Sequence, residues 1–484
     1  LRPRVCFVGG SITTQGGGGR PTLLRLWGDD ASGPFRHGVR AIDSHMGNVG
    51  TPVLTFLAED WVLRHEPDLV FVEAAVNDGD HILENGRRGE EDVRRALEGL
   101  VRQIRQRLPR CKICFVLMYL RTYLPAGRRT GTQAWADGHF SQVELDSVYK
   151  SKVPDIYGAL AEHYGCALLD LGAGLFARLT RSAHEVLFRD DCHHTALGAL
   201  ASALAVDLAF RASSAGVNPA DGRAHLAARL RAAAATTELG AAAVEEVLGA
   251  LGSSGLFAVP AAPEAVSPPG PRRPQGLPGC LDPLHWTGGR AVLVGPESLR
   301  PPAGGWGAGG AASRQRRDRD PIRGEPLDWW LLRPGDELRM AFSGVGFGIL
   351  THVGPDSGWV SYAFPPRGGG GRAKRAGRKC LFDQWSYYYR LNAVMLETRL
   401  AEGEWEVVVR LEPGPPDRGV ARRTPPPGVE GAPRLWLSSG LALIYTQREV
   451  EVTWPETNER LDEGTWDYAP RLGLRYQLES GTEV

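Results

Sequence analysis

The sequence of 484 residues has no excess charge of either sign, because 56 lysines and arginines balance 56 aspartates and glutamates. Without a basic surplus, the chain is not expected to bind nucleic acid through overall electrostatic attraction. It also has no run of 18 apolar residues, so no transmembrane segment is expected. These absences, with 42% hydrophobic and 23% charged residues, indicate a globular chain, and its length predicts about two to four domains.

The seven cysteines do not form a recognisable metal-binding pattern. Cys111 and Cys114 have a C-x-x-C spacing, but they lie in the run CKICFVLM, which is typical of a strand, where residues three apart point to opposite faces. We therefore expect two core thiols, and the lack of a second C-x-x-C pair argues against a zinc site. The redox compartment stays open, with a secreted or endomembrane location preferred over a cytoplasmic one.

Residues 1–212 alternate between strand-like and helix-like patterns. Apolar runs predict strands at Arg4–Val8, Val39–Ser44, Leu69–Val76, Lys112–Met118 and Ala167–Leu171. Helical patterns lie between or after them at Val53–Arg64, Glu91–Leu108, Gln142–His163 and Ala196–Phe210. This alternation predicts an α/β domain with a three-layer αβα, doubly wound (flavodoxin-like) parallel sheet. Active sites of such sheets lie beyond the carboxyl ends of the strands.

The rest of the chain has a different pattern. Residues 213–258 are Ala-rich and helical in pattern, and the Pro-rich residues 259–278 are expected to be a linker. Short alternating runs separated by Gly and Pro turns then predict an all-β, sandwich- or jelly-roll-like domain over residues 279–484. Its clearest predicted strands are Glu337–Phe342, Trp359–Phe364, Glu404–Leu411, Leu435–Leu437 and Leu441–Thr446. The many aromatic residues of this region either fill a core or stack on sugars.

Four short motifs stand at the positions where chemistry is expected. Gly9-Gly10-Ser11 follows the first predicted strand, Gly47 follows the second and Asn77 follows the third. Asp190 precedes His193 by three residues, just before the last helix. Taken singly, these motifs are typical of turns and helix caps. An Asp-x-x-His pair, however, lets the carboxylate accept the imidazole Nδ1–H and leaves Nε2 as a base.

Together and in this order, the four motifs resemble those of the SGNH (GDSL-type) hydrolase family over about residues 4–212. The resemblance implies that Ser11 is a nucleophile and that His193, oriented by Asp190, is its base. It also implies an oxyanion hole formed by the backbone N–H groups of Ser11 and Gly47 and by the Asn77 side chain. The expected reaction is ester hydrolysis through an acyl-enzyme, without a metal or an organic cofactor. The C-terminal β-domain is not covered by the resemblance.

The sequence departs from the family pattern in three places. Gly10 stands where the family has Asp, Ala75 where it has Gly, and His194 where Pro often follows the catalytic histidine. Two registers also fit the last motif, because Asp191 precedes His194 by three residues just as Asp190 precedes His193. The family spacing through Thr195 and Gly198 favours the pair Asp190 and His193.

The substrate is only weakly encoded in the sequence. Several family members that act on polysaccharides carry an extra β-domain, so O-acetyl groups on a carbohydrate such as an acetylated polysaccharide are the leading expectation. One alternative is a non-catalytic structural or binding protein built on the same shell. Another is a lipid esterase or thioesterase, which would have a deep apolar channel beside Ser11. The oligomeric state stays open.

Overall fold

The chain divides into two compact units, Leu1–His285 and Trp286–Val484. The structure is a computed structural model, and in the first unit it describes residues 2–14, 23–24, 27, 38–45, 49–118, 141–190, 192–213, 227–228, 230–232 and 238–252. In the second unit it describes residues 291–294, 313–317, 327–334, 337–344, 346–365, 375–382, 386, 390–397, 400–401, 403–414, 416, 433, 435–445, 466–467 and 475–476. The predicted linker lies outside these ranges, so the predicted domain boundaries stay predictions.

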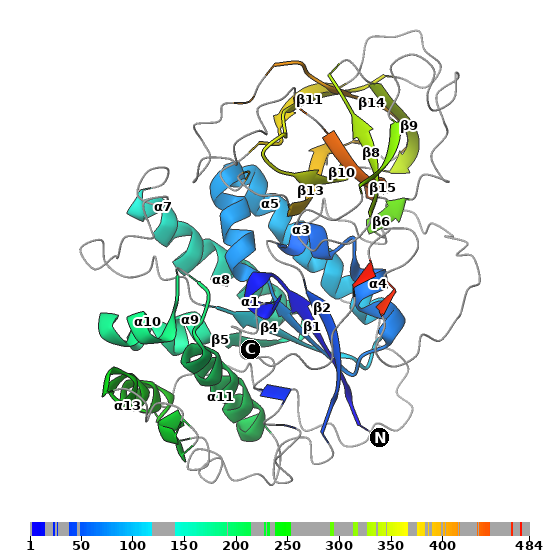
Figure 1. The fold of residues 1–484 in the computed structure, drawn as a ribbon. Coiled ribbons are helices and arrows are strands. Elements are labelled where there is room, and N and C mark those ends of the chain that lie inside the picture. The colour runs from blue at the N-terminus through cyan, green and yellow to red at the C-terminus, as the bar shows by residue number, and fades with distance from the viewer. Residues whose placement is uncertain are drawn as a thin grey trace. The chain divides into compact units, whose positions relative to one another are not determined.

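The first unit contains a parallel sheet of five strands in the order β2-β1-β3-β4-β5 (Figure 1). The strands are β1 (Arg4–Gly9), β2 (Arg40–His45), β3 (Leu69–Glu73), β4 (Lys112–Leu117) and β5 (Ala167–Asp170). Every pairing between them is parallel. Parallel pairing and this strand order confirm the predicted doubly wound fold, and they bring the ends of β1 and β3 side by side.

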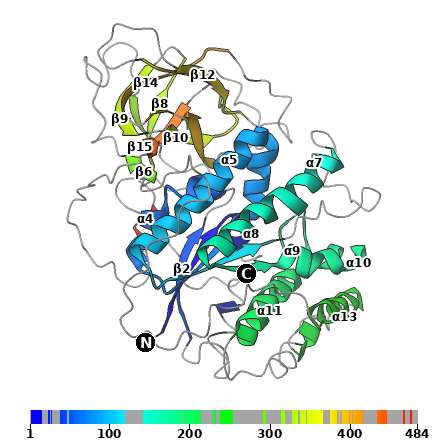
Figure 2. The ribbon, with the colours of Figure 1, turned by 180° about the vertical axis from the view of Figure 1, so that it is seen from behind.

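Helices cover both faces of the sheet, as Figures 1 and 2 show from opposite sides. On one face, α5 (Ala75–Arg107) and α8 (Val153–Tyr164) pack on the strands, and the ring of Tyr157 meets that of Phe115 at 5.3 Å. On the other face, Phe210 of α11 (Ala196–Ser213) lies 5.5 Å from Phe71 of β3. The core is therefore apolar on both sides of the sheet, as expected for buried parallel strands.

The strand expected at Leu69–Val76 is shorter than predicted. It ends at Glu73, and Ala75 already begins helix α5. The sequence pattern failed here because the apolar run continues into a buried first helical turn, and a short apolar run does not distinguish the two states. The helix expected only from Glu91 starts much earlier, although it is kinked at Gly86, whose φ of 56° is in the left-handed region.

Two other predicted helices are interrupted. The segment expected at Val53–Arg64 is split into the short helices α3 (Thr51–Leu54) and α4 (Ala58–Trp61) and the 3-10 turn η1 (Leu63–His65). The segment expected at Gln142–His163 consists of α7 (Gln142–Ser147), the π-helical turn η4 (Val148–Lys152) and α8. Pro154 explains the second interruption. Proline is accommodated in the first turn of α8, but it has no N–H to continue the helical hydrogen bonds from η4.

The remaining helices of the first unit are short or lie in the Ala-rich segment. They are α1 (Ser11–Thr14), α9 (Leu171–Gly174), η5 (Phe176–Arg178), α10 (Arg181–Leu187) and α13 (Glu238–Gly252). Glu246 of α13 accepts hydrogen bonds from the N–H and hydroxyl of Thr180, at 2.9 and 2.8 Å. The Ala-rich segment thus contributes a helix that docks beside α10. No helix among the described residues is long and apolar enough to cross a membrane.

The second unit is built from antiparallel sheets. One sheet has the order β13-β10-β15-β8-β7 with β6 also paired to β15, another has the order β12-β11-β14-β9, and β16 pairs with β17. The strands are β6 (Ala291–Val294), β7 (Ser313–Arg317), β8 (Leu327–Leu332), β9 (Glu337–Gly344), β10 (Gly346–Val353), β11 (Trp359–Phe364), β12 (Arg375–Cys380), β13 (Arg390–Glu397), β14 (Gly403–Leu411), β15 (Leu435–Tyr445), β16 (Trp466–Asp467) and β17 (Arg475–Tyr476).

The two larger sheets share one apolar core, which supports the predicted sandwich. Phe347 and Ile349 of β10 and Val407 and Val409 of β14 are buried in it, and Trp405 packs against it. The two strands expected at Leu435–Leu437 and Leu441–Thr446 are a single strand, β15. Ser-Ser-Gly between them suggests a turn in the sequence, but the strand passes through this point with a shift of register against β10.

Candidate active site

Ser11 stands at the sharp transition from β1 to α1. Gly10 separates the last strand residue from Ser11, and its N–H donates to the Glu73 carbonyl oxygen at the end of β3, at 3.1 Å. Because Ser11 is the first residue of α1, its N–H belongs to the first turn, where backbone donors have no partner within the helix. Ser11 therefore presents a hydroxyl and a backbone donor at the carboxyl edge of the sheet.

Asn77, in the helix that follows β3, reaches the same turn. It lies in the first turn of α5, and the end of its side chain packs so closely on Gly10 that a Cβ at this position would collide with the amide oxygen. The space left by Gly10 thus brings Asn77 to the residue that precedes Ser11. This contact gives a physical reason for glycine where the resembling family has aspartate.

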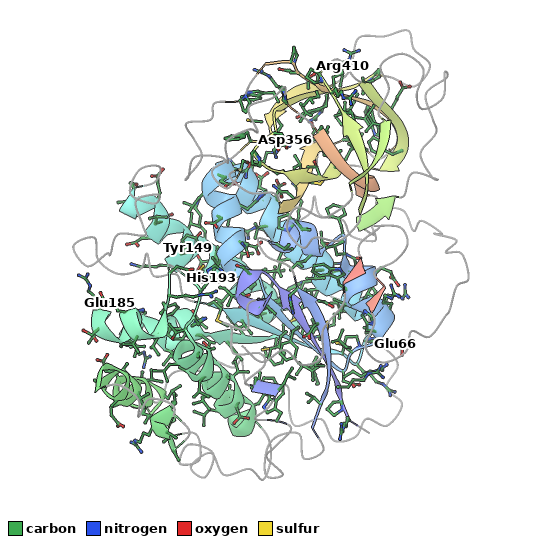
Figure 3. The ribbon with its side chains drawn as sticks, viewed as in Figure 1. Glu66, Tyr149, Glu185, His193, Asp356 and Arg410 are labelled. Carbon is green, nitrogen blue, oxygen red and sulfur yellow. The ribbon has the colours of Figure 1, made fainter. Side chains whose placement is uncertain are left out.

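His193 comes to Ser11 from the loop before α11, and Figure 3 shows it beside α1. Its Nε2 lies 2.8 Å from Ser11 Oγ, although the residues are 182 positions apart. Its Nδ1 lies 2.9 and 2.8 Å from the two carboxylate oxygens of Asp190. The serine hydroxyl, imidazole and carboxylate therefore form one continuous hydrogen-bonded chain, the arrangement needed to activate a nucleophile.

The loop around Asp190 is held by backbone hydrogen bonds. Asp190 Oδ1 accepts from the N–H groups of Cys192 and His193, at 3.1 and 2.8 Å. The Arg189 N–H donates to the His193 carbonyl oxygen at 3.0 Å and closes the loop. Burial alone would raise the pKa of Asp190, but the hydrogen bonds and charge of His193 outweigh it and lower the pKa to about 2. Asp190 is thus a carboxylate at neutral pH.

His194 has the opposite environment from its neighbour. Its side chain is buried, and its ring lies 4.6 Å from that of Phe188 and 5.3 Å from that of Phe176. Its Nε2 is 3.3 Å from the hydroxyl of Ser202 on α11. Successive residues of an extended segment point to opposite sides, so the structure brings His193 to Ser11 and turns His194 into the core.

Two of the predicted site residues, Gly47 and Asp191, lie outside the described residues. In the alternative register, the position of Asp191 is therefore not described, and His194 lies in the core. The roles assigned to Ser11, His193 and Asp190, and to Asn77 in the oxyanion hole, stay predictions, and the distances above are the geometry on which they rest.

Glu73, a buried carboxyl that the sequence analysis missed, is hydrogen-bonded to the short helix that begins at Ser11. Thr13 Oγ1 donates to Glu73 Oε2 at 2.9 Å, and Glu73 is only 5% exposed. Burial raises its pKa to about 8, against the opposing hydrogen bond from Thr13. The available signal was an acid at the end of the apolar run LVFVE, since buried acids are rare unless they are paired or neutral.

A second buried carboxyl links three helices beside the same edge. Asp78 accepts from the N–H and hydroxyl of Thr51 at the start of α3 and from the hydroxyl of Tyr157 on α8, all at 2.7–3.0 Å. Burial raises its pKa to about 6, although these hydrogen bonds oppose the rise. Because Asp78 follows Asn77 directly, this network fixes the first turn of α5 and thereby the backbone that carries Asn77.

An apolar pocket lies on the face of the sheet that α11 covers. Its lining includes Phe7, Phe71 and Met118, with the polar groups of Thr13 and Glu73 at its border. The predicted site residues Ser11, His193 and Asn77 are not part of this lining. The described pocket therefore adjoins the turn that carries Ser11 without opening onto the serine itself.

Comparisons with known proteins agree with the fold. Residues 7–201 match the model of the GDSL-like lipase/acylhydrolase family. A two-domain esterase (CEX) active on acetylated mannans has 14% identity and a TM-score of 0.51, and the match covers 92% of each chain. Its structure co-crystallized with mannopentaose has 13% identity and a TM-score of 0.51, and covers 93% of this chain and 92% of that one. No curated protein matches the sequence.

Proposed function

We propose that the chain is a carboxylic ester hydrolase with Ser11 as its nucleophile, because residues 7–201 match the model of the GDSL-like lipase/acylhydrolase family. The observation that carries this proposal is the chain of contacts from Ser11 Oγ through the His193 ring to Asp190, with distances of 2.8–2.9 Å. A nucleophile and base within hydrogen-bond reach, with the base oriented by a third group, is the arrangement that acyl transfer requires.

In the proposed reaction, Ser11 Oγ attacks the ester carbonyl while His193 Nε2 takes the serine proton. Asp190 holds the Nδ1–H tautomer and stabilises the imidazolium that forms. His193 then gives the proton to the leaving alcohol as the carbon–oxygen bond breaks, and an acyl-enzyme remains. Water activated by the same histidine releases the acid and regenerates Ser11.

The negative charge on the carbonyl oxygen needs donors that are in place before the reaction. We assign the backbone N–H of Ser11 and the Asn77 amide to this role, with Gly47 as the further donor expected from the family resemblance. Each such donor typically contributes about 10²–10³ in rate. The close contact between Asn77 and Gly10 supports the assignment, because it holds the amide at the Ser11 turn.

We further propose that the substrate is an O-acetylated carbohydrate. The support is the two-domain esterase described above, which is active on acetylated mannans and whose fold aligns with 92% of this chain. The second unit of this protein then corresponds to the extra β-domain that several polysaccharide-active members of the family carry. A secreted or endomembrane location is part of the same proposal.

A specific observation keeps a lipid esterase as the second candidate. The pocket beside Thr13 is lined mostly by apolar side chains, including Phe7, Phe71 and Met118, and an apolar pocket suits an acyl chain. Ser11 is not part of its lining, which keeps this candidate second. An acetyl esterase should prefer p-nitrophenyl acetate over the butyrate and octanoate esters, whereas a lipid esterase should prefer the longer chains. Acetate release from acetylated mannan and acetylated xylan then tests the carbohydrate directly.

The role of Ser11 is tested by Ser11→Ala in the full chain. We expect the loss of p-nitrophenyl acetate hydrolysis and of labelling by a fluorophosphonate probe, with an unchanged circular dichroism spectrum. Ser151→Ala, which alters an exposed serine of η4, is the matched control and should retain both. Unchanged turnover in Ser11→Ala would remove Ser11 from the mechanism, and absence of labelling in the wild type would favour the non-catalytic alternative.

A further inference from the structure

Three different metal-binding side chains meet on the loop between α10 and α11. The Asp190 carboxylate, the Cys192 thiol and His193 Nδ1 all offer ligand atoms within 4.8 Å of one another. Cys192 Sγ is 3.7 Å from His193 Nδ1, which is 2.8 Å from Asp190 Oδ2. Among the residues that the structure describes, this is the one such group of three, and all its members are partly exposed.

Two of the three spacings between ligand atoms nearly fit a tetrahedral metal ion. Zinc binds thiolate, imidazole and carboxylate ligands at about 2.0–2.3 Å, which separates neighbouring ligand atoms by about 3.3–3.8 Å. The spacing between Cys192 Sγ and His193 Nδ1 is already in this range, and the spacing between Nδ1 and Asp190 needs to widen by only about 0.5 Å. Because the loop is partly exposed, water can supply the fourth ligand.

We propose that Asp190, Cys192 and His193 form an inhibitory site for a thiol-binding divalent cation such as Zn²⁺ or Cd²⁺. Binding needs a thiolate, so the Cys192 proton goes to solvent. The metal takes the place of the proton on His193 Nδ1, and that proton moves to Nε2, because a neutral imidazole keeps one N–H. One proton is released in total, and no group is oxidised or reduced.

The consequence for catalysis follows from the new position of the proton. With its proton on Nε2, His193 donates toward Ser11 Oγ and is no longer able to accept the serine proton. Asp190, now bound to the metal, also no longer orients the ring. Inhibition thus rests on the proposed function of His193 as the base, whereas metal binding by the loop does not depend on it.

Cys192 differs from most other cysteines of the chain in its exposure. Cys6, Cys111, Cys114 and Cys166 are buried, and burial raises the pKa of each thiol, so they resist forming the thiolate that a metal needs. Cys380 is the other partly exposed cysteine among the described residues. It belongs to no group of three potential ligands there, which makes it a matched control.

The test uses the purified full chain, with Cd²⁺ as a spectroscopic probe and Zn²⁺ as an inhibitor. Cd²⁺ titration should produce one equivalent of the ultraviolet thiolate-to-metal charge-transfer band in the wild type and in Cys380→Ser, but not in Cys192→Ser. Zn²⁺ should inhibit p-nitrophenyl acetate hydrolysis reversibly, and EDTA should restore it. Since losing even an outer partner of a metal site costs about 10–100-fold in affinity, Cys192→Ser should need at least about 10-fold more Zn²⁺.

The control variants separate metal binding from the proposed function. Without metal, Cys192→Ser should keep its turnover within about twofold, because the thiol has no part in the reaction proposed above. Ser11→Ala should keep the Cd²⁺ band while losing turnover. An unchanged band and unchanged Zn²⁺ sensitivity in Cys192→Ser would overturn the metal site. A band without inhibition of the active wild type would overturn the inhibitory role alone, and turnover in Ser11→Ala would overturn the proposed function but not the site.

Discussion

The two units place their polar groups differently because their strands run differently. In the first unit, parallel strands all end at one edge, where Ser11 after β1 and Asn77 after β3 come together with His193. In the second unit, antiparallel neighbours end at opposite edges, and the shared core is built from apolar side chains. Direction of the strands, more than composition, thus determines where distant motifs converge.

Two buried acids lie at the same edge of the first unit. Glu73 and Asp78 are both buried at the carboxyl edge of the parallel sheet, and burial raises the pKa of each carboxyl. Their hydrogen bonds hold the turns that carry Ser11 and Asn77. Placing buried carboxyls at this edge gives up stability for geometry, whereas the core cluster shared by the two larger sheets of the second unit consists of apolar side chains.

The largest expected effect comes from the histidine at the edge. His193→Ala should lower kcat/KM for p-nitrophenyl acetate by about 10⁴- to 10⁶-fold, because the base of a triad is lost, with little change in Tm. His194→Ala is the adjacent control. It should cost about 2–5 kcal/mol of stability, since a buried ring is removed, and should leave the folded enzyme active. Loss of turnover in His194→Ala with retained turnover in His193→Ala would reverse the assignment.

A change in the sandwich core tests the other side of the comparison. Phe347 is fully buried, with its ring 4.9 Å from that of Phe342, so Phe347→Ala should lower the free energy of unfolding of the second unit by about 3–5 kcal/mol. Chemical denaturation followed by tryptophan fluorescence measures this loss.

Turnover of p-nitrophenyl acetate by folded Phe347→Ala should be unchanged. Ala376→Ser on β12, an exposed position, is the control and should change stability by less than about 0.5 kcal/mol. A fall in kcat for Phe347→Ala at denaturant concentrations below its unfolding midpoint would show that the second unit contributes to the chemistry of the first. The contrast between the two units would then fail.

Sequence patterns were sufficient for the sheet, and three of the four motifs, at Ser11, Asn77 and His193, lie together at its edge in the described structure. Four of the five parallel strands lie within two residues of their predicted bounds, since buried parallel strands are nearly continuous apolar runs. The third predicted strand extended too far, into α5, because Ala74, Ala75 and Val76 continue its apolar run. The first half of α5 was missed because Asn, Asp and Gly have low helix propensity, which tertiary packing overrides here.

The choice between the two histidines needed three-dimensional information. Both have an aspartate three residues earlier, and the family spacing gave only a preference. In the structure, the bridge between Phe188 and His194 and the aromatic packing around His194 determine which ring faces the core. The approach of Cys192 to His193 Nδ1 likewise depends on the turn of the loop, which the sequence does not specify.

A smaller catalytic effect is expected at the oxyanion donor. Asn77→Ala should lower kcat by about 10²–10³-fold, because one preorganised donor is lost. Asn85→Ala is matched in residue type and lies on the same helix, where its amide donates to the His81 carbonyl oxygen at 2.9 Å. It should change kcat less than about threefold. A loss below threefold in Asn77→Ala would argue against its role and weaken the convergence attributed to the parallel sheet.

The last expected effect is on stability alone, and it is the pH dependence that the buried acid gives to the first unit. The pKa of Glu73 is raised from 4.5 to about 8 in the folded state, so the folded chain binds more protons than the unfolded chain between these values. The contribution of Glu73 to stability is therefore complete below about pH 4.5 and is lost as the pH rises through about 8, with a slope of at most about 1.4 kcal/mol per pH unit.

Glu73→Gln mimics the protonated acid, and its amide oxygen can still accept from Thr13, so the variant should lose this slope and exceed the wild type in stability near pH 8. Urea denaturation from pH 5 to 9 measures both curves, and Glu162→Gln, at an exposed position of α8, should parallel the wild type. The difference between the two curves reports the ionisation of Glu73 together with its charge interaction with Asp78. Parallel curves for Glu73→Gln and the wild type would mean that Glu73 ionises as freely as a surface acid, and its burial at the carboxyl edge of the parallel sheet would carry no pH dependence.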